Sequence, residues 1–304
     1  MAGKNKTPWF IQVCLLGLLS GCASTPSESG ISAEHLGLND NSTDVLFATE
    51  YPVISEEDAL SRAAQAIKEG DTDRALFYLV RALQFRPENV ELLVQIANIQ
   101  MSRQNFVFAK RAFLMALHHD ADHSRALEGL GLIYMAEGHD EAAVNELTLA
   151  VANDDSLWRA HDALGVYADK VEDYTTALQH YDLALSINPQ AAHVLNNRGY
   201  SRYLAGDIQG ATLDFYAAAN NRGFSRAWVN LGKIYAEEGL YHDAISTYKL
   251  VMSEAQALNN TGYAAMENGD LEQAERYLTE AIRLSPTYFP SAEESLSLLG
   301  ELWR

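Results

Sequence analysis

Basic residues are scarce in this sequence: 22 lysines and arginines stand against 41 aspartates and glutamates, and the formal net charge is -19. A charge of this sign opposes a phosphate backbone, so nucleic acid is excluded as the main partner and a basic or neutral protein partner is favoured. Cysteine is also scarce. Its two copies, Cys14 and Cys22, lie near the N-terminus, so the body of the chain has no thiol or disulfide chemistry.

The sequence also lacks the motifs of the common catalytic and cofactor sites. It contains no phosphate-binding glycine loop, no Gly-x-Ser-x-Gly elbow and no His-Glu-x-x-His motif. The segment from His118 to His123 is rich in histidine and aspartate, but its spacing matches no defined metal site, and an exposed polar turn is favoured. We therefore predict no enzyme, no cofactor and no metal.

The first 21 residues have the organisation of a signal peptide, with Lys4 and Lys6 before an apolar stretch too short to span a bilayer comfortably. The stretch ends in Leu19-Ser20-Gly21-Cys22, which resembles the lipobox of bacterial lipoproteins. The resemblance implies removal of residues 1–21 and a lipid on Cys22. Ala23 is not the aspartate that retains such proteins at the inner membrane, which implies outer-membrane attachment with the body facing the periplasm. An ordinary signal peptide with a chance cysteine is the alternative.

Residues 22–54 form the expected lipidated tether. They are rich in serine, threonine, glycine, asparagine and aspartate and show no sustained helical periodicity, as in a flexible linker. From Ser55 onward the pattern changes to alanine-rich amphipathic helices. Ser55 and Asp58 are spaced as an N-cap that satisfies first-turn amides, so we place the start of the folded body there.

A repeat of about 34 residues fills the rest of the chain. Small residues recur at one position of each unit: Ala63, Ala97, Gly131, Gly165, Gly199, Gly232 and Gly262. An alanine follows each of them at a constant interval: Ala75, Ala109, Ala143, Ala177, Ala211, Ala244 and Ala274. A large side chain comes one helical turn later: Leu79, Phe113, Leu147, Tyr181, Phe215, Tyr248 and Leu278. Small residues let two helices approach closely, and the large residue fills the neighbouring gap.

This pattern resembles the tetratricopeptide repeat, a helix-turn-helix unit. The resemblance implies an all-α fold: a right-handed superhelix, or α-solenoid, of about seven repeats. The expected units are 56–89, 90–123, 124–157, 158–191, 192–224, 225–254 and 255–288. Residues 289–304 are expected to form a capping helix, with Ser291 and Glu294 as its capping box and Leu296, Leu299 and Trp303 covering the open end of the stack.

Glycines mark the expected end of the first helix in most units: Gly70, Gly138, Gly206, Gly239 and Gly269. A left-handed residue stops a helix, and glycine adopts that conformation most easily. The second repeat is the weakest match, because Asn105 stands where the glycine signal is expected.

A partner-binding groove is expected on the first helices of the fifth to seventh repeats. Asn197, Asn230 and Asn260 occupy the same repeat position, where carboxamides can pair with the backbone of an extended peptide. The alternative, that these asparagines serve the scaffold alone, stays open. Aromatic and basic residues complete the predicted groove: Tyr200, Tyr203, Arg226, Lys233 and Tyr263, with Arg198 and Arg202 nearby.

The C-terminal phrases Asn259-Asn260-Thr261-Gly262-Tyr263 and Leu284-Ser285-Pro286-Thr287-Tyr288 look most like the TadD lipoproteins of Flp (Tad) pilus assembly. That resemblance implies a pilotin or assembly factor whose groove holds a secretin or another pilus-assembly subunit. Two alternatives remain: an NlpI-like adaptor for peptidoglycan hydrolases and a type IV pilus pilotin of the PilF/PilW kind.

Overall fold

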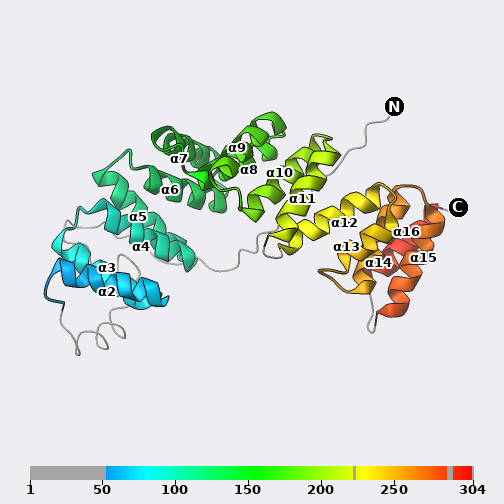
Figure 1. Cartoon of the computed structure of the whole chain (residues 1–304), viewed down its shortest axis with the longest axis horizontal. Helices are drawn as coiled ribbons and strands as arrows, with labels where there is room; N and C mark the ends of the chain where they lie inside the picture. The colour runs from blue at the N-terminus through cyan, green and yellow to red at the C-terminus, as the bar shows by residue number, and fades with distance from the viewer. Residues whose placement is uncertain (1–52, 222–223, 286–289, 303–304) are drawn as a thin grey trace. The chain divides into compact units, whose positions relative to one another are not determined.

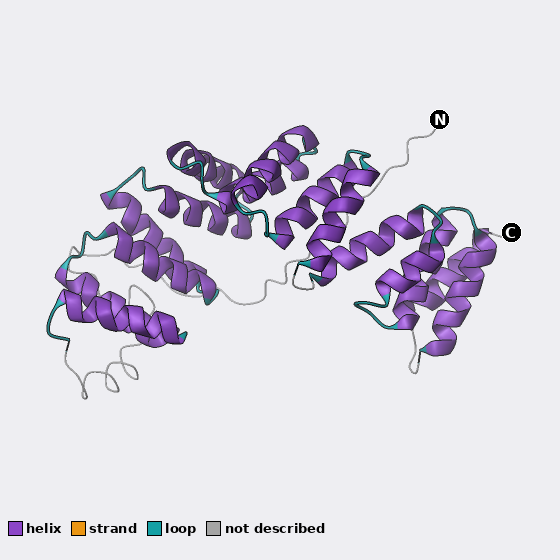
Figure 2. Ribbon diagram, in the orientation of Figure 1, coloured by secondary structure: helices purple, strands orange, loops and turns teal. Residues whose placement is uncertain are grey.

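The computed structural model describes residues 53–221, 224–285 and 290–302. All of them belong to one compact unit, Ser32–Arg304. Within these residues every regular element is an α-helix, and short turns connect the helices (Figure 2). None of these helices is long and apolar enough to cross a membrane. Cys22, the predicted signal peptide and nearly all of the predicted tether lie outside the described residues.

The described helices form seven hairpins followed by one more helix (Figure 1). We call the first helix of each hairpin helix A. In chain order, the helices A are α2 (Glu56–Glu69), α4 (Val90–Ser102), α6 (Ser124–Glu137), α8 (Trp158–Lys170), α10 (Ala192–Leu204), α12 (Ser225–Glu237) and α14 (Glu254–Glu267). We call the second helix of each hairpin helix B. In chain order, the helices B are α3 (Thr72–Phe85), α5 (Phe106–His119), α7 (Asp140–Asn153), α9 (Tyr174–Ile187), α11 (Ile208–Asn220), α13 (Tyr241–Tyr248) and α15 (Leu271–Leu284). The last helix is α16 (Pro290–Leu302).

The hairpins stack in chain order. Each helix B packs against the helix A that follows it, as α5 does against α6 and α9 against α10. From α4 onward, successive helices A also contact one another. Each repeat therefore buries its apolar faces against its neighbours, which is the arrangement of an α-solenoid. This confirms the predicted fold class.

The final helix covers the end of the stack, because α16 packs on both α15 and α14. Ala292 and Leu299 of α16 are buried, and Leu299 joins Ala265 and Ala274 in one apolar cluster. The helix begins at Pro290, a favoured first position, so Ser291 lies inside the first turn and not at the predicted N-cap. Trp303 lies outside the described residues.

The predicted pairing of small and large residues holds the two helices of each repeat together. A Cβ atom on Gly165 would lie 2.6 Å from the Tyr181 ring, and one on Gly131 would lie 2.7 Å from Cγ of Leu147. Tyr181 and Leu147 are fully buried. Only glycine allows helix A to approach helix B this closely.

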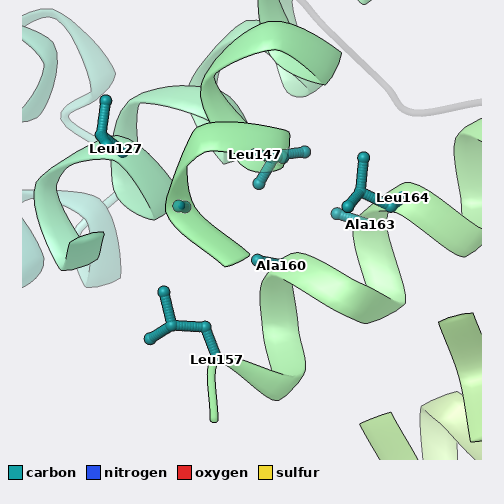
Figure 3. Packing of buried hydrophobic residues seen from close by; sticks show 7 residues of the cluster. Leu127, Leu147, Leu157, Ala160, Ala163 and Leu164 are labelled. Carbon is teal, nitrogen blue, oxygen red and sulfur yellow. The ribbon is translucent and has the colours of Figure 1, made fainter. Parts of the chain in front are cut away.

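The apolar core continues from one repeat into the next without a break. Figure 3 shows Leu127 of α6 and Leu147 of α7 beside Ala160, Ala163 and Leu164 of α8, in one cluster of buried residues. Because this cluster contains residues of two repeats, the contact between them is part of the same core as the contact within a repeat. Burial of apolar area stabilises both contacts by about 25 cal/mol per Å².

Helix ends follow the local signals in the sequence. The Ser55 side chain accepts a hydrogen bond from the Asp58 amide at 3.1 Å, which confirms the predicted N-cap. All five predicted terminator glycines have positive φ. In the second repeat, however, the left-handed position belongs to Gln104, with φ of 61°, and not to Asn105. Glu172 takes it in the fourth repeat, with φ of 62°.

Candidate partner-binding face

Successive helices A contact one another from α4 onward, and we call the exposed side of this row of helices the helix-A face. All eight predicted groove residues belong to helices of this face: Asn197, Tyr200 and Tyr203 on α10, Arg226, Asn230 and Lys233 on α12, and Asn260 and Tyr263 on α14. The order of helices therefore places the predicted residues on three adjacent elements.

Four of them surround one small hollow between α10 and α12. The hollow has a volume of about 10 Å³ and is lined by Tyr200, Tyr203, Asn230 and Lys233 together with Phe215 and Ile234. The rings of Tyr200 and Tyr203 are stacked, with centroids 6.1 Å apart. Nζ of Lys233 lies 5.1 Å from the centroid of the Tyr203 ring, within cation–π range. The hollow is a shallow aromatic and cationic patch, not a pocket for a small molecule.

Tyr203 contributes to packing more than to the surface. Its side chain is only 5 % exposed, and its hydroxyl donates to the Glu237 carboxylate at 2.8 and 2.7 Å. Burial raises the pKa of Tyr203, and the hydrogen bond to Glu237 acts in the same direction. Because Glu237 lies on α12, this contact joins the fifth repeat to the sixth.

The asparagine series also connects repeats. Nδ2 of Asn197 donates to Asp162 of the preceding helix A at 3.1 Å. Nδ2 of Asn230 donates in the same way to Asn196 at 2.9 Å. The third member, Asn260, contacts Sδ of Met252 within its own segment at 3.5 Å. One amide donor of Asn197 and one of Asn230 are therefore used between repeats, which is a structural role consistent with the scaffold alternative.

Two predicted residues are more accessible. Tyr263 is 44 % exposed, and the negative charge of Glu267 raises the pKa of its phenol. Arg226 is exposed at the start of α12 and forms no salt bridge within the described part of the chain. Neither residue lines the small hollow, and Asn260 does not line it either.

The neighbouring arginines of α10 belong to a buried ion-pair network. Asp214 of α11 is nearly inaccessible, and its carboxylate accepts two hydrogen bonds from Arg198 at 2.9 and 2.7 Å. Arg202 donates to the same carboxylate at 2.8 Å. These two arginines hold α10 against α11 and are committed to the fold.

The helix-A face also has a larger hollow, which was not predicted from the sequence. It has a volume of about 340 Å³ and spans α4, α6 and the start of α8; its lining residues are Asn98, Arg125, Glu128, Asp154, Ser156, Leu157, Trp158 and Arg159. Arg125 and Arg159 occupy the same position of successive repeats. Their recurrence is visible in the sequence when successive repeats are aligned at the first residues of helix A.

The histidine-rich segment forms the junction between α5 and α6. His118 and His119 end α5, and Nδ1 of His123 accepts a hydrogen bond from the Ala126 amide at 3.3 Å as the N-cap of α6. Within residues 53–221, 224–285 and 290–302, no three or more histidine, cysteine, aspartate or glutamate side chains are grouped as metal ligands would be.

Family models of the tetratricopeptide repeat match residues 66–124, 163–225, 225–254 and 255–288. The chain is a tetratricopeptide-repeat protein. Among curated proteins, tetratricopeptide repeat protein 6 of Homo sapiens is 28 % identical over 167 residues, which are 54 % of this chain and 32 % of that protein. Our tetratricopeptide-repeat protein thus spans about a third of the length of that relative.

Two solved structures share its fold. A tetratricopeptide repeat protein from Parabacteroides merdae has a TM-score of 0.53 and 18 % identity; the match covers 81 % of this chain and 98 % of the other. PilF of Pseudomonas aeruginosa has a TM-score of 0.50 and 16 % identity, over 80 % of this chain and 96 % of PilF. At these identities the similarity establishes the fold alone. Tetratricopeptide repeats form extended surfaces that bind protein partners.

Proposed function

We propose that this tetratricopeptide-repeat protein is an outer-membrane-anchored scaffold that binds a segment of another protein on its helix-A face during assembly of an Flp (Tad) pilus. The observation that carries the binding proposal is the set of exposed aromatic and basic side chains on α12 and α14, which are Arg226, Lys233 and Tyr263. Aromatic and basic side chains are the residue types that dominate binding energy in protein interfaces. The proposed partner is a secretin or another pilus-assembly subunit.

Two sequence features support the pilus and membrane parts of the proposal. Leu19-Ser20-Gly21-Cys22 resembles a lipobox, and the phrase around Asn260, Gly262 and Tyr263 resembles the TadD family. A lipoprotein carries several acyl chains, and each buried methylene contributes about 0.8 kcal/mol, so the anchor would be stable. The tether would let the repeats reach subunits away from the membrane.

The binding proposal is tested by capture of partners from detergent-solubilised envelopes. The face variant combines Lys233→Ala with Tyr263→Ala. The matched control combines Lys249→Ala with Tyr216→Ala. Both side chains are exposed, but Tyr216 is on α11, a helix B, and Lys249 directly follows α13, another helix B. We expect the parent and the control to recover a secretin or pilus subunit and the face variant to lose at least about tenfold of it.

Other recoveries contradict specific parts of the proposal. Recovery of peptidoglycan hydrolases in place of pilus subunits would support the NlpI-like adaptor. Equal recovery by the face variant and the control would exclude the helix-A face of the last three repeats as the binding surface.

The anchor is tested separately with Cys22→Ser. We expect the parent to incorporate labelled palmitate and to sediment with outer membranes, and the variant to lose both properties. Incorporation of palmitate by the variant would exclude Cys22 as the lipidated residue.

A further inference from the structure

The second residue of helix A changes charge along the array. It is glutamate in the first two repeats, Glu57 and Glu91, and basic in the next four: Arg125, Arg159, His193 and Arg226. We call these four residues the first-turn column. All four side chains are exposed. A column of basic residues in successive repeats is unexpected in a chain with almost twice as many acidic residues as lysines and arginines.

Helix stability does not explain the column. The helix dipole favours acidic side chains in the first turn and disfavours basic ones there. The first turns of α2, α4 and α14 follow this preference with glutamates, and those of α6, α8, α10 and α12 contain no acidic residue. The four central repeats therefore carry basic residues at a position that the helix dipole does not favour for them.

Salt bridges do not explain the arginines either. Within the described residues Arg125, Arg159 and Arg226 form no salt bridge. Most other arginines there do, such as Arg86 with Glu56 and Arg103 with Asp73. The three arginines of the column thus have charge and hydrogen-bond donors to offer to another molecule.

The carboxylates beside the column are already engaged by this chain. Glu128 accepts a hydrogen bond from the Ala160 amide at 3.2 Å, and burial raises its pKa against the opposing effect of the nearby arginines. Asp154 accepts from the amide and hydroxyl of Ser156 at 2.9 and 2.5 Å. Asp162 accepts from Asn197 at 3.1 Å and lies 3.4 Å from Nε2 of His193. Within the described residues His193 is the member of the column whose side chain lies within ion-pair distance of a carboxylate.

The column borders the larger hollow and an aromatic surface. Arg125 and Arg159 both line the hollow of about 340 Å³. The Trp158 ring lies between two members: its centroid is 5.1 Å from the Arg159 guanidinium carbon and 5.4 Å from the His193 ring centroid. A hollow, a tryptophan and arginines that form no salt bridge within the described residues together form a surface suited to an anionic chain with apolar side chains.

We infer that the first-turn column binds an acidic, extended peptide segment of the partner protein, with carboxylates reaching Arg125, Arg159 and Arg226 and an apolar side chain against Trp158. The inference rests on the proposed function, because it names the chemistry of the segment held by the helix-A face. The negative charge of the whole chain favours a basic or neutral partner, but the first-turn column itself has three arginines that form no salt bridge within the described residues. Complementary local charge sets orientation and register in an interface.

The spacing of the repeats defines the sequence of such a segment. Packed helices lie about 10 Å apart, and an extended chain advances about 3.3 Å per residue. Carboxylates at about every third residue would therefore match successive members of the column. Acidic residues grouped side by side would reach only one of them.

The test uses the purified full-length protein in mild detergent and a fluorescein-labelled peptide of about twelve extended residues with aspartate at every third position. Two peptides of the same length serve as comparisons: one with asparagine in place of aspartate and one with the same aspartates grouped together. Fluorescence anisotropy gives each Kd. We expect the spaced acidic peptide to bind at least about tenfold more tightly than either comparison.

The column variant combines Arg125→Gln, Arg159→Gln and Arg226→Gln. The control removes the same charge outside the helix-A face with Lys249→Gln, Arg276→Gln and Arg283→Gln, all of which are exposed. We expect the column variant to bind the spaced peptide at least about 30-fold more weakly than the control does. Its melting temperature should equal or exceed that of the parent, because a cation leaves the first turn of a helix.

Three results would overturn the inference: equal affinity of the two variants, equal affinity of the parent for the aspartate and asparagine peptides, or a melting temperature of the column variant well below that of the control. The envelope capture separates this inference from the proposed function. If column variant and parent recover the same pilus subunit equally, the inference fails and the function stands. If the spaced peptide binds through the column but no pilus subunit is recovered, the function fails and the inference stands.

Discussion

Substitution of Gly129 by alanine tests how tightly neighbouring repeats are joined. Gly129 lies on α6, and a Cβ atom there would be 2.1 Å from Cζ of Phe113 on α5, in the preceding repeat. Ordinary contact begins at about 3.4 Å, so the ring or the helix must move by about 1 Å. Phe113 is fully buried, so its ring is surrounded by other parts of the chain. The substitution therefore forces the junction between the second and third repeats apart.

The size of the effect follows from two opposing contributions. Alanine in place of glycine inside a helix stabilises by about 1 kcal/mol. Overpacking of a buried contact destabilises by about 1 to 3 kcal/mol, and the short distance at Gly129 places this substitution at or above the upper end. We expect Gly129→Ala to lower the free energy of unfolding by about 2 kcal/mol, or the melting temperature by about 4 to 8 °C.

The assay is thermal unfolding monitored by circular dichroism, with Gly300→Ala as the control. Gly300 lies within α16 and has no atom within 4 Å of the position of a new Cβ, so the same substitution should leave stability unchanged or raise it by up to about 1 kcal/mol. Phe113→Leu should lower the free energy of unfolding less in the Gly129→Ala variant than in the parent, because leucine relieves the clash. A melting temperature of Gly129→Ala at or above that of the parent would refute the close-packing argument.

Three further predictions concern the backbone, the buried ion pairs and pH. Gln104→Gly should raise the free energy of unfolding by about 0.5 to 1 kcal/mol in urea titrations, because Gln104 has a φ of 61° that favours glycine; no gain would mean that the surrounding turn relieves the strain. Asp214→Ala should lower the free energy of unfolding by about 2 kcal/mol or more, because Arg198 would lose its buried carboxylate partner. An unchanged free energy of unfolding would show that the network is solvated. His161 and His180, whose ring nitrogens lie 3.2 Å apart, both have a lowered pKa caused mainly by burial. The unfolded chain therefore binds more protons than the folded one just below the ordinary histidine pKa, so stability is full above about pH 6.5 and decreases as the pH decreases below it. Between pH 8 and pH 5 the melting temperature of the parent should decrease more than that of the His161→Gln, His180→Gln double variant, and a parallel decrease in both proteins would contradict this linkage.

The repeat architecture was determined by the sequence alone. A position that needs glycine for a left-handed turn, or a small residue for close helix approach, is set by local geometry and recurs with every unit. Gly138 and the pair Gly165 and Tyr181 are examples: each was predicted by its spacing and each is found in that role. The turn at Gln104 was misplaced by one residue, because a glutamine gives no signal for a left-handed conformation.

The tertiary structure decided which polar side chains are used by the fold and which are exposed for a partner. Asn197 and Arg226 look equally suited to a partner in the sequence, yet one donates to the preceding repeat and the other forms no salt bridge in the described residues. Spacing places a residue on a helix, but hydrogen bonds depend on the side chains that the adjacent repeat brings within about 3 Å. Those neighbours are some 34 residues away along the chain, so spacing alone does not distinguish a polar side chain that joins two repeats from one that is exposed.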